Sequence, residues 1–196
     1  MADEFETEEG TLIRYHGQAE QVRVPEGIRI IGPQAFKENR SLRSVVLPAS
    51  VREIGLEAFQ FCMNLREVSG GEGIVSVERD AFQGTVWYRY YSENETEWKE
   101  DFLFLGRCLL KGRRNLRAAL IPEGTLMIAA DAFQEHVLLK QLEIPPSVTY
   151  IGWRAFEGCT ALTQLRVPGT VRKLGWHCFK GCNRLERVTL EEGIEI

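Results

Sequence analysis

The sequence predicts a repeat solenoid in which parallel β-strands stack coil upon coil, and three observations support this fold class. An Ala-Phe pair recurs every 23 residues, with one longer interval of 51 residues between Phe82 and Phe133. Apolar residues stand at fixed distances before each Phe and alternate with outward positions, as in a strand. A proline follows most of these strands, and it ends pairing because it has no N–H to donate. A unit this short cannot bury its apolar edge alone, whereas stacked units share a core.

Each predicted unit consists of one strand followed by a short helical or irregular turn. The first inward strand position is filled by Val22, Val45, Val68, Ala119, Leu142 and Leu165. The phenylalanines of the six units are Phe36, Phe59, Phe82, Phe133, Phe156 and Phe179, the last of which follows Cys178 instead of Ala. Each buried Phe is expected to contribute roughly 1.5–3 kcal/mol to the free energy of unfolding.

The long interval indicates that the chain consists of two similar modules. The segments FETEEGTLIRYHG and FLFLGRCLLKGRR precede the two sets of coils, and each has a central glycine, Gly10 or Gly106, which is typical of a β-hairpin. We therefore expect modules at residues 1–97 and 98–196, each a hairpin followed by three coils. Because both modules carry the same repeat, we predict a single domain with one continuous core. Residues 84–101 are expected to leave the stack as a polar excursion.

These repeats resemble the BspA-like leucine-rich repeat family, whose unit reads approximately LxxLxIPxxVxxIGxxAFxxCxxL. The segments LRSVVLPASVREIGLEAFQFCMNL (42–65) and LKQLEIPPSVTYIGWRAFEGCTAL (139–162) follow that pattern nearly position for position. The resemblance covers essentially the whole chain and implies a bacterial repeat protein. It is specific for the fold and almost silent on function, because one fold supports many functions.

Composition excludes some classes of partner. The net charge of −4 and the pI near 5.6 argue against a general nucleic-acid or anionic-membrane binder. No segment approaches the ~20 apolar residues of a membrane span, so no membrane insertion is expected. The start MADEFETEEG is acidic where a secretory signal would be basic and then apolar, which predicts a cytoplasmic protein as the chain stands. The resemblance implies instead a secreted or surface-attached protein, if the chain is a mature fragment.

One position of the repeat contains most of the cysteines. It is filled by Asn39, Cys62, Thr85, His136, Cys159 and Cys182. In leucine-rich repeats this position faces the interior at a turn, where a small side chain meets backbone groups, and we favour that interpretation. The alternative is a soft-metal site formed by His136, Cys159 and Cys182. Parallel coils separate these side chains by about 4.8 Å without the convergence that zinc requires, so we expect no metal.

The redox state of the thiols is predicted to be reduced. A disulfide between Cys159 and Cys182 is sterically conceivable, because bridged Cα atoms lie roughly 4.4–6.8 Å apart. The odd number of cysteines, five, and the lack of an export signal favour free thiols.

No catalytic site and no cofactor are predicted. A cysteine nucleophile needs an oriented histidine base. His177 directly precedes Cys178, so their side chains should diverge, and Cys178 replaces a core alanine. His16 lies in a predicted hairpin without an obvious partner. The glycines recur with the repeat and mark turns, so none forms a phosphate-binding loop.

The outward strand positions form the first candidate site, a surface for an unidentified protein or peptide. These positions make a mixed polar face with apolar residues at Val46 and Leu120. The candidate residues on this face are Arg23, Val46, Leu120, Gln141, Glu143, Gln164 and Arg166.

Aromatic residues form a second candidate site. Trp153 and Trp176 share one position of the repeat, and Tyr150 lies nearby in the sequence. Two stacked indoles could clasp a sugar ring or a partner side chain, whereas the simpler interpretation is that they cover the edge of the core. A further aromatic cluster follows Phe82 and either shields the last coil before the break or forms a binding loop; it contains Trp87, Tyr88, Tyr90, Tyr91 and Trp98.

The sequence therefore favours a non-enzymatic module that binds a protein or peptide through the outer face of its strands. The alternatives are a surface adhesin or glycan-binding module that uses exposed aromatics, an enzyme or metal protein that uses the His/Cys position, and a structural spacer. The sequence also ends within a repeat, at LERVTLEEGIEI, which predicts self-association through this end or a longer repeat array.

Overall fold

The computed structural model describes residues 4–93 and 100–191, and it confirms the predicted solenoid of parallel strands. By its internal contacts the chain divides into two compact units, unit 1 (Met1–Glu93) and unit 2 (Asn94–Ile196). Each unit contains one of the two predicted hairpins, followed by repeat coils. The single continuous core proposed for both modules stays a prediction.

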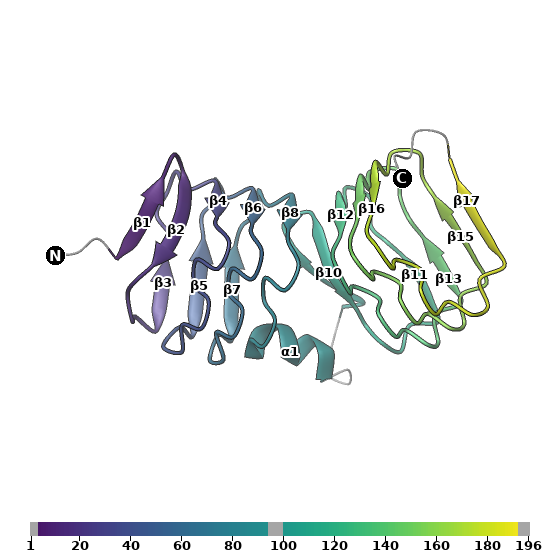
Figure 1. The fold of residues 1–196 in the computed structure, drawn as a ribbon, viewed down its shortest axis with the longest axis horizontal. Coiled ribbons are helices and arrows are strands. Elements are labelled where there is room, and N and C mark those ends of the chain that lie inside the picture. Colours follow the sequence, from purple (N-terminus) through teal and green to yellow (C-terminus); the bar gives the residue numbers. More distant parts are fainter. Residues whose placement is uncertain (1–3, 94–99, 192–196) are drawn as a thin grey trace. The chain divides into compact units, whose positions relative to one another are not determined.

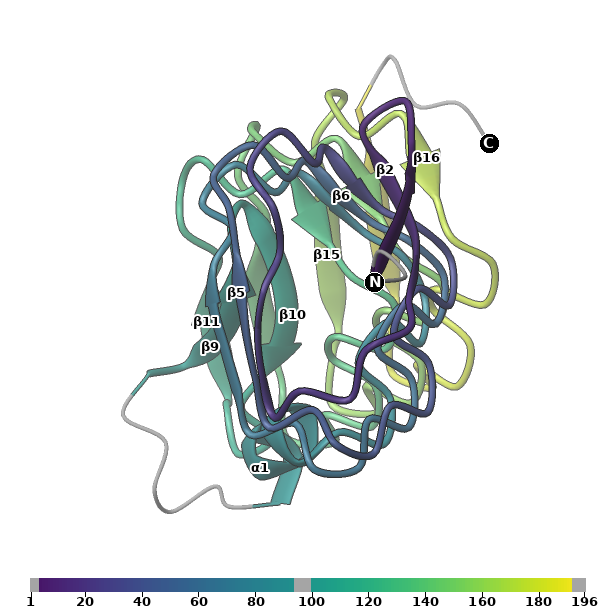
Figure 2. The same cartoon turned by 90° about the vertical axis from the view of Figure 1, so that its left-hand side faces the viewer.

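Unit 1 consists of a hairpin and coils that carry a short strand on each of two sides (Figure 1). The hairpin joins β1 (Phe5–Glu8) to β2 (Thr11–Tyr15). Beside β2, a five-stranded sheet is completed by β4 (Ile30–Ile31), β6 (Glu53–Ile54) and β8 (Ser76–Val77). The second sheet contains β3 (Gln21–Arg23), β5 (Ser44–Leu47) and β7 (Glu67–Gly70). Figure 2 shows β5 and β6 on different sides of their coil.

Unit 2 repeats this arrangement with one difference. Its hairpin joins β9 (Phe102–Leu105) to β10 (Cys108–Gly112), and the same sheet continues through β12 (Met127–Ile128), β14 (Tyr150–Ile151) and β16 (Lys173–Leu174). On the other side, β11 (Ala118–Leu120) pairs with β13 (Gln141–Glu143), and β15 (Gln164–Val167) pairs with β17 (Arg187–Leu190). Within residues 100–191, no ladder joins β13 to β15, whereas the sequence predicts pairing between all successive coils.

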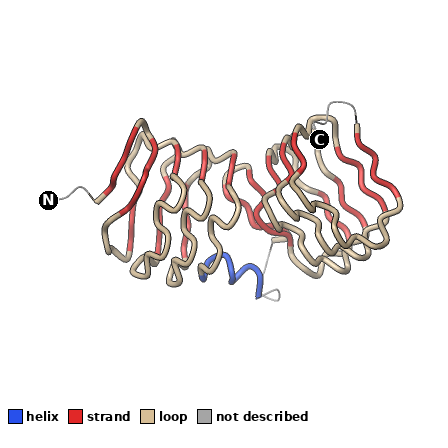
Figure 3. The backbone as a smooth tube through the Cα atoms, in the orientation of Figure 1, coloured by secondary structure: helices blue, strands red, loops and turns tan. Residues whose placement is uncertain are grey.

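The sequence period is also the pairing register. Val22 lies opposite Val45, and Leu165 lies opposite Val188, so each residue pairs with its equivalent in the next coil. The strands are short, and loops and turns make up most of each coil (Figure 3). The predicted alternation is present in β15, where Leu165 and Val167 are buried and Gln164 and Arg166 are exposed.

The core of each unit contains a stack of phenylalanine rings. In unit 1 the ring centres of Phe36 and Phe59 lie 4.7 Å apart, and those of Phe59 and Phe82 lie 5.1 Å apart. In unit 2 the distance is 5.6 Å between Phe133 and Phe156 and 5.8 Å between Phe156 and Phe179. All four pairs are stacked with nearly parallel planes, as expected for equivalent side chains in successive coils.

Two positions in every turn adopt left-handed backbone conformations. The first lies two residues before the Phe and is Gln34, Glu57, Asp80, Asp131, Arg154 or His177. The second lies two residues after it and is Glu38, Phe61, Gly84, Glu135, Gly158 or Gly181. A left-handed conformation costs a non-glycine residue roughly 1–2 kcal/mol. The cost is offset because these turns direct N–H groups to the next coil, as from Arg154 to the Trp176 C=O at 3.0 Å.

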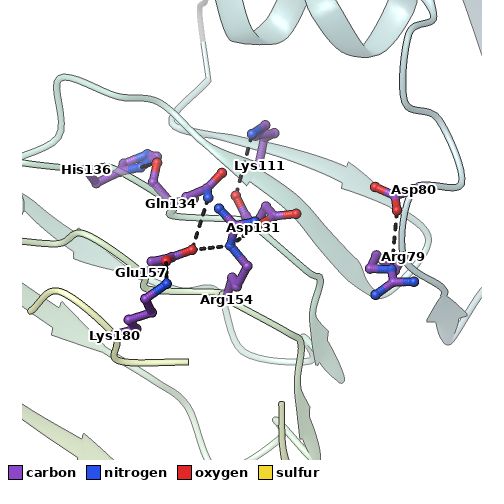
Figure 4. Close-up of polar contacts among 9 residues, drawn as sticks. All are labelled: Arg79, Asp80, Lys111, Asp131, Gln134, His136, Arg154, Glu157 and Lys180. Carbon is purple, nitrogen blue, oxygen red and sulfur yellow. Dashed lines mark hydrogen bonds and ion pairs between the residues drawn. The ribbon is translucent and has the colours of Figure 1, made fainter. Parts of the chain in front are cut away.

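Charged side chains at the same turns connect three successive coils of unit 2 (Figure 4). The Arg154 guanidinium lies 3.6 Å from the Asp131 carboxylate and forms an ion pair with Glu157. Glu157 also contacts the Lys180 ammonium at 3.3 Å and accepts a hydrogen bond from the Gln134 amide at 3.2 Å. Partly exposed ion pairs contribute about 0–1 kcal/mol each, so this network supports the register more than it stabilises the fold.

The position that contains most of the cysteines faces the interior, as predicted. The Cys62 thiol donates to the Phe36 C=O at 3.0 Å, and the Cys159 thiol donates to the Phe133 C=O at 3.1 Å. At the same position Asn39 donates to the Gly17 C=O at 3.0 Å. These side chains therefore satisfy carbonyl groups of the preceding coil or hairpin, whether the side chain is a thiol or an amide.

His136 occupies the same position in unit 2 and makes the same kind of contact. Its ring is buried, and Nε2 lies 3.0 Å from the carbonyl oxygen of Gly112. The other ring nitrogen lies 3.2 Å from the carbonyl oxygen of Gln134. Burial lowers the pKa of His136, so its neutral form is favoured in the fold.

The long interval begins with a helix, which corrects the expectation of a purely polar excursion. α1 (Val86–Glu93) follows Thr85, whose hydroxyl accepts a hydrogen bond from the Tyr88 N–H at 3.1 Å. This is the contact of a helix N-cap, for which threonine is a favoured residue. Residues 94–99, including Trp98, lie outside the described residues.

Trp87 at the start of α1 covers the last phenylalanine of unit 1. The indole is buried and meets the Phe82 ring edge-on, with ring centres 4.8 Å apart. The main-chain N–H of Trp87 donates to the Leu65 C=O at 2.8 Å. These contacts support the shielding interpretation for Trp87, whereas Tyr90 on the same helix is 40% exposed.

Replacing Phe156 by Ala tests the importance of the ring stack. Phe156 is fully buried and stacks on rings in both neighbouring coils. Phe156→Ala should lower the free energy of unfolding by about 3–5 kcal/mol in urea denaturation, because it removes a large side chain and leaves a cavity. The exposed Gln164→Ala serves as the control and should change it by within about ±0.5 kcal/mol. Equal losses for both variants would contradict the observed register.

The buried His136 should make stability depend on pH. Because its folded-state pKa is lowered, its contribution is fully present above the unfolded pKa of about 6.5 and is lost as the pH falls through the folded pKa. His136→Asn, which copies Asn39 at the same position, should remove this loss, whereas His177→Asn at an exposed turn should retain it. Unfolding free energies between pH 8 and pH 5 would measure the difference. An unchanged profile in His136→Asn would contradict the assignment.

Candidate partner-binding surface

The strand face of unit 1 carries the first two predicted binding residues. Arg23 on β3 is exposed, and Val46 on β5 is half-buried directly beside it. Ser69 on β7 continues the same column. Between these outward positions, Val22 and Val45 are buried, so the face is held by core residues on rigid paired strands.

The strand face of unit 2 carries the other five predicted residues. Leu120 on β11 is 68% exposed and lies opposite Glu143 on β13, whose side chain is also exposed. Gln141 on the same strand and the pair Gln164 and Arg166 on β15 are exposed as well. The role of these side chains in binding stays a prediction.

A groove on this face of unit 2 was not evident from the sequence. It has a volume of about 340 Å³ and is lined by residues of β13, β15 and β17, namely Gln141, Leu142, Glu143, Gln164, Leu165, Arg166, Arg187 and Thr189. Arg166 forms an ion pair with Glu191, which also accepts a hydrogen bond from the Gly169 N–H at 3.0 Å. The predicted residues Gln141, Gln164 and Arg166 thus surround one concave site.

The aromatic candidates have separate environments. The Arg154 guanidinium lies over the Trp153 ring, 4.4 Å from its centre, in a cation–π contact. The Lys173 ammonium lies 5.8 Å from the centre of the Tyr150 ring. Trp176 is 81% exposed. Of the three aromatic candidates, Trp176 therefore offers the most accessible ring to a ligand.

The histidine and cysteine column does not resemble a metal centre. Within residues 4–93 and 100–191, no group of three His, Cys, Asp or Glu side chains is arranged to hold a metal ion. The thiols of Cys159 and Cys182 instead each donate to a carbonyl of the preceding coil, at 3.1 Å. All five cysteines are free thiols in the structure.

The cysteines differ strongly in their acidity. Burial raises the pKa of Cys62, Cys108 and Cys178 to about 12, so these thiols stay protonated. Cys182 is only partly buried, and the neighbouring Cys159 thiol lowers its pKa. That proximity, together with burial, raises the pKa of Cys159. Cys178 is a core residue, as its place in the repeat predicts.

Two further observations bear on the predicted partners. None of the helices that the structure describes is long and apolar enough to span a membrane. In the last described coil, Val188 and Leu190 on β17 are 38% and 42% exposed. Self-association through this part of unit 2 stays a prediction.

The difference in acidity predicts selective thiol reactivity. In the folded protein at pH 8, Cys182 should react with a disulfide reagent such as Ellman's reagent first, because the thiolate is the reactive form. Cys182→Ser should abolish the fast phase, and Cys62→Ser should leave it unchanged. Equal rates for all thiols would contradict the lowered pKa of Cys182.

Several solved structures are similar to this chain. One is a leucine-rich repeat protein from T. pallidum, with 26% sequence identity over 92% of this chain and 75% of that chain and a TM-score of 0.47. Another is a leucine-rich cell surface protein from Faecalibacterium prausnitzii, with 23% sequence identity over 93% of this chain and 50% of that chain and a TM-score of 0.43. A third is a leucine-rich repeat protein from Bacteroides ovatus, with 20% sequence identity over 99% of this chain and 54% of that chain and a TM-score of 0.43. The chain thus spans half to three quarters of the length of these proteins, and curated proteins contain no match to it.

The family is shown by a match that extends along nearly the whole chain. The model of the BspA type leucine-rich repeat region, in 6 copies, matches residues 13–111 and 104–196. The matched segments contain the repeated Phe stack, the interior turn position and both strand faces described above. The chain therefore belongs to the BspA type leucine-rich repeat family.

Proposed function

We propose that this chain is a non-enzymatic interaction module whose outer strand faces bind a protein or peptide. The observation that carries the proposal is the concave site of unit 2, where exposed amide and charged side chains surround a groove of about 340 Å³. These side chains stand on strands whose inward residues, such as Leu142 and Leu165, are buried. A surface held in this way loses little conformational entropy on binding.

The composition of the two faces favours a polypeptide ligand. Leu120 is a large apolar side chain that is 68% exposed beside Glu143, so a partner can cover it and pair with a charge at the same time. Gln141 and Gln164 add donors and acceptors that suit peptide groups. Arg23 and Val46 offer a similar mixture on unit 1.

The alternative is an adhesin or glycan-binding module that uses exposed aromatics. Trp176 supports it, because an indole that is 81% exposed can stack on the apolar face of a sugar ring. This site lies at a turn and not on the strand face, so the two functions can be tested with different variants.

Selection from a displayed library of random peptides tests the proposal. Peptides that bind the intact chain should bind at least about tenfold more weakly to Arg166→Glu or to Arg23→Glu, because a reversed charge on the binding face repels the same ligand. Arg172→Glu, an equal charge change at an exposed position just before β16, is the control. If neither face variant weakens binding, the strand face is not the site. Binding to an oligosaccharide array that Trp176→Ala abolishes would favour the glycan alternative.

A further inference from the structure

In unit 2 no ladder joins the described strands β13 and β15, and we call this interruption the seam. In unit 1 the Val24 N–H donates to the Val46 C=O at 3.0 Å, which joins β3 to β5. The equivalent groups across the seam are the Ile144 N–H and the Arg166 C=O. In the described part of the chain, these two groups form no hydrogen bond with each other.

The other end of the strands shows the same interruption. In unit 1 the Arg43 N–H donates to the Glu20 C=O at 2.7 Å. The equivalent bond in unit 2 would run from the Thr163 N–H to the Lys140 C=O, and it is absent among residues 100–191. The seam thus extends along the whole strand.

The same two coils remain paired on their other side. There β14 pairs with β16, with Tyr150 opposite Lys173 and Ile151 opposite Leu174. The Phe156 N–H also donates to the Cys178 C=O at 3.0 Å, which joins one of these coils to the next at the turn. The seam is therefore a local opening of an otherwise closed stack.

The strands beside the seam differ from the paired strands at one inward position. Leu142 and Leu165 face each other across it and are both buried. The paired strands have smaller side chains at this inward position: Val22 with Val45, Val45 with Val68, Ala119 with Leu142, and Leu165 with Val188. Among the strand neighbours within each described unit, the seam alone combines two leucines. Leu142 and Leu165 are thus the bulkiest inward pair among these strand neighbours, in an interior that is closely packed.

The seam leaves a row of backbone groups without ladder partners. In a parallel ladder, alternate residues direct their N–H and C=O to opposite neighbours. The Glu143 C=O accepts from the Ile121 N–H on the β11 side at 3.1 Å, so the peptide groups of Leu142 face the seam. By the same alternation, the peptide groups of Gln164 and Arg166 face it from β15. The groove described above lies over this row.

We propose that the seam is a strand-insertion site for an extended peptide that carries an acidic side chain. The peptide pairs in parallel with β13 on one side and with β15 on the other, and its main chain uses the groups of Leu142, Gln164 and Arg166. The proposal rests on the proposed function, since it assigns the peptide ligand to one place on the strand face. Insertion breaks no ladder bond, and the β14–β16 pairing acts as the hinge.

The lining of the groove indicates the chemistry of the peptide. Two of its side chains, Arg166 and Arg187, are positive and one, Glu143, is negative, which favours an acidic residue in the ligand. An acidic side chain can replace Glu191 as the partner of Arg166. The eight lining residues include no aromatic side chain, so the groove lacks the platform that a sugar ring would use.

A peptide with the sequence LKQLEIP, copied from residues 139–145, is a suitable probe. Inserted in register, its Glu would lie beside Arg166, because Glu143 and Arg166 occupy equivalent positions of neighbouring coils. Binding to the intact chain is measured by fluorescence anisotropy. N-methylation of the Leu and Glu amides of the probe's LE pair should weaken binding at least about tenfold, since it removes one main-chain donor toward each strand. No binding of the probe, or equal binding of the methylated form, would overturn the proposal.

Hydrogen exchange of the free chain provides an independent readout. The Ile144 amide should exchange at least about tenfold faster than the equivalent Val24 amide and should become protected when the probe binds. The double variant Leu142→Val/Leu165→Val should close the ladder, so its Ile144 amide should be protected and the probe should no longer bind. The control Leu162→Val, at another buried leucine, should keep the fast exchange of the Ile144 amide and the binding of the probe. Equal protection of Ile144 and Val24 in the free chain would refute the open seam.

These outcomes separate the seam from the wider proposal. Peptides that bind the strand face with no sensitivity to N-methylation would leave the proposed function in place and overturn strand insertion. Loss of binding in Arg166→Glu fits both strand insertion and binding to the outward side chains. The variant Leu142→Val/Leu165→Val separates the two, because it changes the seam and leaves every outward side chain as it is.

Discussion

The in-register pairing of each coil with the next is the constraint on which the rest of this structure depends. Equivalent residues of successive coils lie opposite one another. The Phe36 ring therefore stacks on the Phe59 ring, Val22 pairs with Val45, and N–H groups in the turns donate to C=O groups in the turns of the next coil. The contacts of a coil are therefore made almost entirely with its immediate neighbours, as in other repeat proteins. An interruption between two coils can therefore remain local: no ladder joins β13 to β15 in the described part of unit 2, yet β14 and β16 stay paired.

The features that follow from burial could be predicted from the sequence. Phe36, Phe59, Phe133 and Phe156 are fully buried, and both hairpins lie where the glycines indicate. The interior turn position could also be recognised, since its residues are small or able to donate a hydrogen bond. Repetition made these predictions reliable, because every column was observed several times.

The features that depend on width or backbone conformation could not be predicted. Asp131 and Arg154 share a left-handed conformation although their side chains have opposite charges, because the hydrogen bond to the next coil decides it. The seam lies between two strands whose inward residues, Leu142 and Leu165, fit the alternation of the repeat, so the pattern alone does not reveal it. The outward residues of the candidate site were identified by alternation, but the groove among them was missed for the same reason. The Thr85 cap could have indicated α1, but the polar run at residues 92–101 suggested an excursion for the whole interval.

The seam also has a mechanical consequence for unit 2. Tension along the axis of a stack loads its interfaces in series, so the interface with the fewest strand bonds yields first. Between β13 and β15 that yielding requires no ladder bond to break, whereas the bonds between β14 and β16 still resist complete separation. The unit can therefore lengthen on one side by rotation of two intact coils about the other. The stacked rings of Phe156 and Phe179 lie across the same interface, so the core there belongs to the side that resists separation.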